Sequence, residues 1–202
     1  MMRDGFHPKS LLGLLTEVVL IGVSVFLALL ANQWSDARQH REGANATLRY
    51  FREEIVTNQQ AIEGRRQYHE ALRREIDSFL QSDAPKTLES LYSTTHFHGL
   101  EPITFERTAW DLALASQSLS YLPPKLAYAI SRVYTRQQAF QTLENSILQS
   151  FLAPSTFASQ DVTGLARSMG AYLIDVNIHE PDLLKLYEQL LPQIDAHAPP
   201  LP

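Results

Sequence analysis

LLGLLTEVVLIGVSVFLALLA, residues 11–31, is a run of 21 residues with one ionisable side chain, Glu17. As a helix it spans about 31 Å, at about 1.5 Å per residue, which matches a hydrocarbon core of about 30 Å. Fourteen of its residues are Leu, Ile, Val or Phe, and these contribute about −6 kcal/mol to insertion. That gain outweighs a cost of about 3 kcal/mol for Glu17, so the run predicts a transmembrane helix.

The flanks of this run indicate an uncleaved anchor. The run is about twice as long as a signal-peptide apolar core, and no A-x-A pattern closes it. We therefore expect a short flank at 1–10, with Asn32 and Trp34 at the membrane interface. Positive residues, Arg3 and Lys9, precede the run, whereas the charges just after it are balanced. This difference weakly favours an N-terminus inside and a C-terminal part outside.

One side of the expected span carries small residues together with its carboxyl. By helical spacing these are Gly13, Glu17, Ser24, Ala28 and Ala31. Small residues on one face allow close helix approach, so one interpretation is an oligomerisation face with a buried, protonated carboxyl. The others are a carboxyl that snorkels to the headgroups, or an ion or proton contact.

Residues 32–82 predict a long stalk helix that continues the span. They contain no proline, and a heptad seam of alternate three- and four-residue steps runs along them. Its positions are Leu48, Phe51, Ile55, Asn58, Ile62, Arg65, His69, Leu72, Ile76 and Phe79. Three of the ten are polar, so we favour a seam covered by later helices of the chain over a homo-oligomeric coiled coil, which stays the alternative.

Residues 83–192 predict a helical bundle that packs on the stalk, and 193–202 a proline-rich tail. The expected helices are a short one from Pro85 to Tyr92, residues 105–119, 124–152 and 161–178, and a last one that opens at Pro181 and ends near Pro192. No stretch alternates with period two. The fold class is therefore all-α: a single N-terminal transmembrane helix continuing into a long amphipathic stalk helix, then a bundle.

Two stretches resemble a family of bacterial single-pass inner-membrane proteins known only as a domain of unknown function. The first is EVVLIGVSVFLALLANQW, whose pattern of a Glu, an apolar run, LAL, Asn and Trp is met by Glu17, Ala28, Leu29, Asn32 and Trp34. The resemblance implies a bacterial inner-membrane anchor, with the C-terminal part in the periplasm for an inside N-terminus. It brings no catalytic residues.

The second stretch is residues 104–140, TFERTAWDLALASQSLSYLPPKLAYAISRVYTRQQAF. The family often has an aromatic residue, then Ser-Gly, then Leu-Pro, then a Tyr on the next helix. The corresponding places are Trp110, Ser116, Leu122-Pro123 and Tyr134. Gln117 stands where glycine is common, a departure that weakens the case for a special backbone turn at 116–117.

Composition and motifs exclude several classes of function. There are 17 Lys and Arg against 22 Asp and Glu, a net charge of −5, which argues against a nucleic-acid partner. The chain has no cysteine and no phosphate-binding glycine loop, nucleophile elbow or HExxH. His96 and His98 are the cluster nearest to a metal site, but their spacing is poor for two ligands of one ion. We expect no catalytic residues, metal or cofactor.

Trp110 and Tyr134 are the candidates for a pocket, with a core role as the other interpretation. The sequence favours a non-enzymatic, membrane-anchored interaction or scaffold protein. Its expected partners are the lipid bilayer, an unknown protein, and a second copy bound through the span and stalk helices. The alternative is an extracytoplasmic sensor or ligand-binding helical module.

Overall fold

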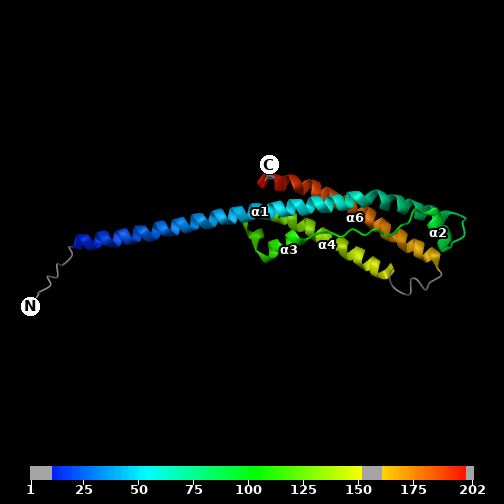
Figure 1. Cartoon of the computed structure of the whole chain (residues 1–202), viewed down its shortest axis with the longest axis horizontal. Coiled ribbons are helices and arrows are strands. Elements are labelled where there is room, and N and C mark those ends of the chain that lie inside the picture. Colours follow the sequence, from blue (N-terminus) through cyan, green and yellow to red (C-terminus); the bar gives the residue numbers. More distant parts are fainter. Residues whose placement is uncertain (1–10, 152–160, 199–202) are drawn as a thin grey trace, which may run out of the picture. The chain divides into compact units, whose positions relative to one another are not determined.

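The computed structural model of the chain describes residues 11–151 and 161–198, with side chains from Leu15 onward. Within these ranges every regular element is helical, which confirms the all-α prediction (Figure 1). The α-helices are α1 (Leu11–Gln81), α2 (Leu88–Thr94), α3 (Thr108–Ala115), α4 (Pro124–Phe151) and α6 (Val162–His197), and a 3-10 helix, η1, covers Ser118–Tyr121. A long N-terminal apolar helix is thus followed by a helical bundle.

The chain divides into two compact units, Met1–Gly43 and Ala44–Pro202. The first unit contains the N-terminal part of α1, and all of its described side chains are exposed. In the described part of the chain, α1 is the one helix long and apolar enough to cross a membrane. Its most apolar window has a mean hydropathy of 2.1, and none of that window is buried.

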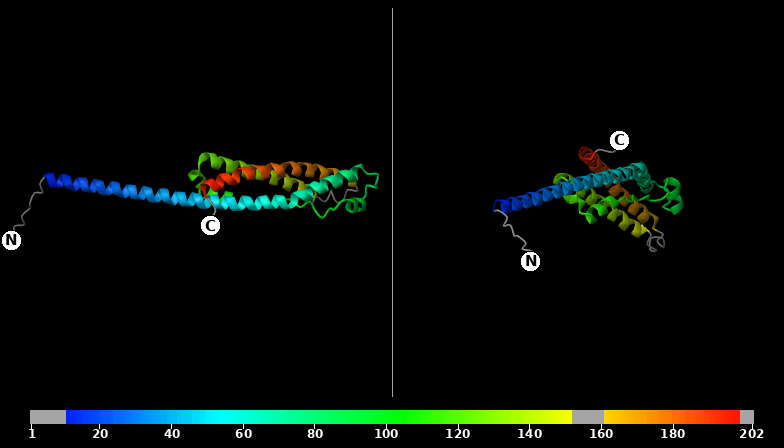
Figure 2. Two further views of the ribbon diagram at one scale, coloured as in Figure 1. Left: turned by 90° about the horizontal axis from the view of Figure 1, so that it is seen from above. Right: turned by 60° about the vertical axis from the view of Figure 1, so that its left-hand side comes forward.

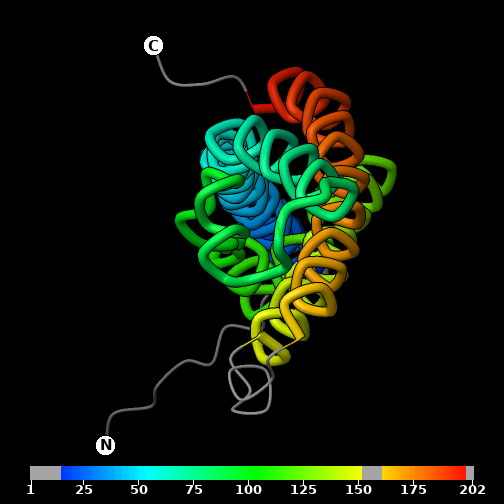
Figure 3. Tube along the Cα trace, turned by 90° about the vertical axis from the view of Figure 1, so that its right-hand side faces the viewer, coloured from blue at the N-terminus to red at the C-terminus, as the bar shows by residue number. Residues whose placement is uncertain are grey.

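The second unit is built on the amphipathic part of α1. Nine of the ten heptad positions are buried within the unit, and Arg65 is half-buried. Residues of α3, α4 and α6 join them in one hydrophobic core, and Figures 2 and 3 show α4 and α6 beside this part of α1. The favoured interpretation, in which later helices cover the seam, is the arrangement that the structure has.

Two predicted helix boundaries at prolines were wrong. The structure has a single helix, α6, that passes through Pro181 and Pro192 and ends at His197. Each proline is flanked by core residues: Glu180 is fully buried beside Pro181, and Ile194 is fully buried two residues after Pro192. Packing on both sides of each proline outweighs the lost backbone hydrogen bond. The expected tail thus begins at least five residues later than 193, and residues 199–202 lie outside the described part.

The smaller elements also differ in detail from the prediction. α2 begins at Leu88, because the Thr87 hydroxyl accepts a hydrogen bond from the backbone N–H of Ser90 at 3.1 Å and caps the helix there. The helix expected over 105–119 is shorter and ends at Ala115. Gln117 then takes a left-handed conformation, with φ 56°. The special turn at 116–117 is therefore present although the chain lacks the glycine.

Candidate functional site

The predicted helix-packing face lies on the apolar part of α1. Glu17, Ser24, Ala28 and Ala31 are all exposed there, while the side-chain surroundings of Gly13 lie outside the described residues. The Ser24 hydroxyl donates to the carbonyl oxygen of Leu20 at 2.8 Å, so it satisfies its hydrogen bond within the helix and adds little polar surface to the face.

The residues predicted at the membrane interface, Asn32 and Trp34, come directly after the helix-packing face in the sequence of α1. Trp34 is 70% exposed, and Asn32 donates from Nδ2 to the Asp36 carboxylate at 3.1 Å. An exposed indole just beyond an apolar helix segment is typical of the headgroup level of a bilayer.

Trp110 of α3 and Tyr134 of α4 come together, as the sequence suggested. Their rings stack at 5.0 Å between centroids, and the ring of Phe51 on α1 packs 5.6 Å from that of Tyr134. The Tyr134 hydroxyl donates to Glu54 Oε1 at 2.6 Å, and Glu54 Oε2 accepts from the backbone N–H of Ala109 at 2.7 Å. Tyr134 is buried and Trp110 half-buried, so the pair belongs to the core and also forms one wall of a surface cavity.

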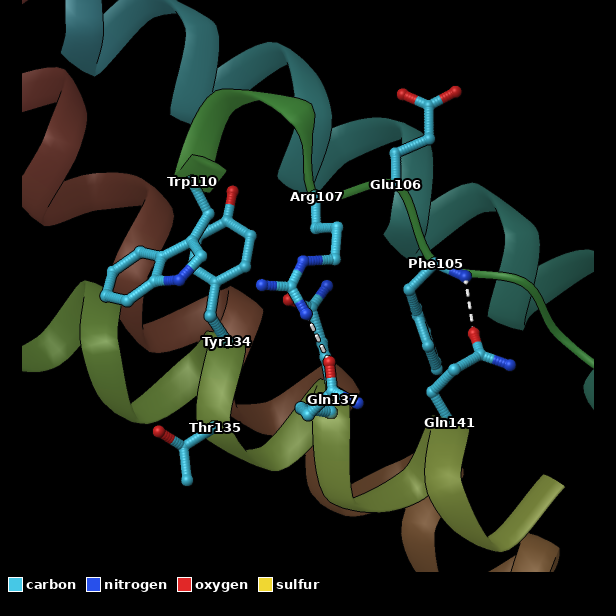
Figure 4. Close-up of a pocket in the computed structure, with 9 residues that line it drawn as sticks. Phe105, Glu106, Arg107, Trp110, Tyr134, Thr135, Gln137 and Gln141 are labelled. Atoms are coloured by element: carbon cyan, nitrogen blue, oxygen red, sulfur yellow. Dashed lines mark hydrogen bonds between the residues drawn. The ribbon is translucent and has the colours of Figure 1, made fainter. Parts of the chain in front are cut away.

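The cavity beside this pair measures about 250 Å³ (Figure 4). Phe105 and Gln141 form its other end, where Gln141 Oε1 accepts from the Phe105 backbone N–H at 3.0 Å. The Arg107 guanidinium lies over its middle, donates to Gln138, and is ion-paired with Asp111 at 2.8 Å. The volume falls just below the range of about 300–1,000 Å³ that is usual for small-molecule sites.

Tyr134 cannot act as a base in this cavity. Burial, reinforced by the hydrogen bond to the Glu54 carboxylate, raises the pKa of its hydroxyl well above the ordinary value. The hydroxyl therefore stays protonated and positions Glu54, whose other oxygen satisfies an N–H group in the first turn of α3.

A second polar site lies inside the bundle, and sequence reasoning missed most of it. His69 of α1 donates from Nδ1 to Glu180 Oε1 of α6 at 2.6 Å, and its Nε2 lies 3.1 Å from the carbonyl oxygen of Leu100. Nearby, the Tyr172 hydroxyl donates to Glu144 Oε2 at 2.6 Å. We call His69, Glu144, Tyr172 and Glu180 the core charge cluster; each is at most 1% exposed.

The partners of His69 determine its protonation. The Leu100 carbonyl oxygen can only accept a hydrogen bond, so Nε2 of His69 carries a hydrogen. An ionised Glu180 also accepts, from Nδ1, and with that partner the imidazole is positively charged. Burial by itself would lower the pKa of His69, but the hydrogen bond and the charge of Glu180 outweigh it and raise the pKa. The His69–Glu180 pair is therefore a buried ion pair.

Two carboxylate oxygens of this cluster, Glu144 Oε1 and Glu180 Oε2, are buried without a hydrogen-bond partner. Burial raises the pKa of Glu144 above its usual value. Protonation of Glu144 removes an unpaired negative charge from this low-dielectric core, which lowers the cost of burying the carboxyl.

The sequence analysis noted one member of this cluster, His69, as a polar residue at a heptad position. Glu144 and Glu180 lie on the core faces of α4 and α6, at helical spacing from Phe140 and Leu183. That spacing could have identified them as buried, although it could not have paired them.

The histidines that stood nearest to a metal site have other partners. His96 donates from its backbone N–H and from Nδ1 to the Glu75 carboxylate, at 2.8 and 2.7 Å. His98 stacks on Tyr68 at 4.2 Å and pairs with Glu101 at 3.0 Å. Among the described residues, no group of three or more His, Asp or Glu side chains could hold a metal ion.

No protein-family model, no curated protein and no solved structure matches the chain. The resemblance to a bacterial membrane-protein family therefore stays a prediction from two stretches of sequence.

Proposed function

We propose that the chain is a membrane-anchored helical interaction or scaffold protein without enzymatic activity. The observation that carries this proposal is the contrast between two parts of the described chain. Residues 15–30 of α1 expose an apolar surface on every side, which water does not favour. In the second unit, by contrast, polar side chains of the core bind one another, as His69 binds Glu180 and Tyr172 binds Glu144.

The bilayer is the first partner in this proposal. We assign the span to a bacterial inner membrane, with the N-terminus in the cytoplasm and the bundle in the periplasm. Because the chain has no cysteine, Tyr92→Cys provides a single thiol on exposed α2. Labelling of intact cells by a membrane-impermeant maleimide would support this orientation, and labelling only after cell lysis would reverse it.

The second partner is a protein. Because the α1 seam is buried in its own unit, self-association through the stalk would need another surface, and the span is the better candidate for a homo-oligomer. A different protein would bind the exposed surfaces of the bundle, where Leu112 and Leu114 of α3 are each about half exposed (52% and 51%).

In-cell photocrosslinking tests the interaction proposal. A photoreactive side chain at Glu63, which is exposed on α1, samples the surroundings of the stalk, and the same side chain at buried Ile62 is the matched control. A defined second protein crosslinked from Glu63 and not from Ile62 would support a scaffold role. Crosslinks only within the chain, from Glu63 and from a second site at Leu114, would contradict it.

The alternative is a ligand-binding module, and the cavity beside Trp110 and Tyr134 favours it. Its aromatic walls suit a small planar ligand. The Arg107 guanidinium, which is ion-paired with Asp111, has further N–H donors for a carboxylate on that ligand. The chain has two tryptophans, so Trp34→Phe leaves Trp110 as the single reporter. Saturable quenching of its fluorescence by small aromatic carboxylates, abolished in Arg107→Gln, would support this alternative. Linear quenching that is equal in both proteins would exclude this ligand class.

A further inference from the structure

A groove of about 680 Å³ runs between α4 and α6, separate from the cavity at Trp110. Tyr128, Arg132 and Arg136 line it from α4, and Asp182, Lys185 and Leu186 line it from α6. Further along α6, Asp195 pairs with Arg52 of α1 at 2.6 Å. The groove therefore lies toward the end of the second unit that contains Ala44, where the chain enters.

The groove is basic, whereas the chain as a whole is acidic. Arg136 pairs with Asp182 at 3.0 Å. Arg132 and Lys185 are exposed and form no ion pair with any residue that the structure describes. Three cations and one carboxylate give this groove a local charge of +2, in a chain whose net charge is −5. An anionic surface would therefore be attracted to this groove and repelled by most of the remaining protein.

An exposed aromatic residue stands at the edge of the groove. Tyr128 is 67% exposed, more than any other large apolar side chain in the described part of the second unit. Lys125, one helical turn before it, is also exposed. Tyrosine together with Lys and Arg is the composition of protein surfaces that lie at the headgroup level of a bilayer.

We propose that the α4–α6 groove docks on the headgroups of a bilayer that contains anionic phospholipids. The phosphates bind Arg132, Arg136 and Lys185, and the Tyr128 ring enters the interface. The apolar segment of α1 selects this occupant, because it keeps the second unit close to lipid. The connection, residues 32–43, is helical within α1 and spans about 18 Å at about 1.5 Å per residue. Such a tether raises the effective concentration of lipid at the second unit, so weak contacts are enough for docking.

Site-specific labelling in nanodiscs tests this docking, and the cysteine-free chain makes it direct. Full-length Tyr128→Cys, labelled with a fluorophore, is placed in discs of phosphatidylcholine with or without phosphatidylglycerol, with nitroxide-labelled lipid as quencher. Quenching is expected in the anionic discs and is lost at high salt. Tyr92→Cys is the matched control, because Tyr92 is 54% exposed on α2, away from the groove, and stays unquenched.

A charge variant separates the groove from general attraction. Arg132→Gln with Lys185→Gln lowers the ratio of docked to free groove about 30-fold, the change that corresponds to about 1 kcal/mol for each cation at an anionic surface. Arg74→Gln with Arg167→Gln removes the same charge from exposed arginines elsewhere in the unit and leaves the ratio within about twofold. An equal loss in both double variants would overturn the groove as the site.

The inference rests on the membrane anchor of the proposed function and not on its protein partner. A label at Val23→Cys, in the apolar part of α1, reports insertion separately. If Val23 is quenched and Tyr128 is not, the groove proposal is wrong and the anchor stands. If neither the Val23 label nor the Tyr128 label is quenched, both the membrane anchor and the docking of the groove are wrong. A Tyr128 label that is shielded from aqueous iodide but not quenched by lipid is covered by protein, and this also overturns lipid docking.

Discussion

Gln117 holds a backbone conformation that its side chain disfavours. Its φ of 56° costs a residue with a Cβ about 1 kcal/mol or more, yet its carbonyl oxygen accepts from the backbone N–H and the hydroxyl of Ser120, at 3.1 and 2.7 Å. These hydrogen bonds retain the turn between α3 and η1. Gln117→Gly should relieve the strain and raise the free energy of unfolding by about 0.5–1 kcal/mol.

Urea unfolding of the full chain in detergent, followed by circular dichroism, measures this change. The matched control is Gln67→Gly, at an exposed helical position of α1. This variant should lower the free energy of unfolding by about 1 kcal/mol. If glycine destabilises the protein at both positions, the turn at Gln117 is not strained.

The core charge cluster makes stability depend on pH. The pKa of His69 is raised in the fold, so its contribution is complete below its unfolded value, about 6.5, and is lost as pH rises through the folded value. The raised pKa of Glu144 acts with the same sign, because a carboxyl kept protonated by the fold loses stability on ionising. The free energy of unfolding should therefore fall as pH rises, from about 4.5 upward for the Glu144 contribution and from about 6.5 upward for the His69 contribution.

Glu144→Gln tests the contribution of the second carboxyl. Glutamine resembles the protonated acid and can still accept from the Tyr172 hydroxyl, which is 2.6 Å from Glu144 Oε2. The variant should therefore unfold at higher urea than the wild type at alkaline pH, and its stability should vary less with pH. A pH profile parallel to that of the wild type would show that Glu144 does not titrate in this range.

Glu180→Gln should have the opposite effect, since it removes the charge that neutralises a buried imidazolium. Breaking a buried ion pair costs about 3–5 kcal/mol, and both side chains of this pair are 0% exposed. The unfolding midpoint in urea should fall sharply below pH 6, where His69 would otherwise be charged, and less at high pH. A loss that does not change with pH would indicate a packing defect instead.

Among the elements, α1 and α4 were predictable and α6 was not. Apolar spacing defines the α1 seam, of which nine of the ten positions are buried. In α4, Leu126 and Ile130 are four residues apart and both are buried. In α6, a local rule about Pro181 and Pro192 predicted a break and an end. The helix continues because packing against the other helices stabilises it by more than each proline costs in lost backbone hydrogen bonding. The local sequence around a proline does not show how much such packing contributes.

Pro192 gives a direct measure of that local cost. It is exposed, so Pro192→Ala changes little packing while it restores one backbone hydrogen bond of α6. We expect a gain of about 1–2 kcal/mol in the free energy of unfolding, less than the full helical penalty of about 3 kcal/mol because proline also restricts the unfolded chain. Gln193→Ala, at the next position, should change stability by less than about 0.5 kcal/mol, and a similar small effect at Pro192 would contradict this account.

At the scale of the whole molecule, sequence identifies surfaces better than partners. The exposed apolar segment was predicted from hydropathy, and Trp110 and Tyr134 were predicted as candidates for a pocket or for the core. The core charge cluster joins α1, α4 and α6 across more than 100 residues of sequence, from His69 to Glu180. Such a pairing depends on how three helices pack, which the helical period of each one does not determine.

The span should also associate with a second copy through its small-residue face. Ala28 lies on this face by helical spacing, and Gly22 lies on the opposite side of α1, where an added Cβ would meet no other atom within 4 Å. Ala28→Leu should weaken self-association about fivefold, or about 1 kcal/mol, because a bulky side chain keeps the helices apart, whereas Gly22→Leu should not. Energy transfer between copies labelled at Tyr92→Cys in lipid vesicles measures this self-association.

Glu17→Gln should preserve insertion, and it should preserve association if the carboxyl is protonated. Loss of the oligomer with normal insertion would show that the charge of Glu17 holds the copies together.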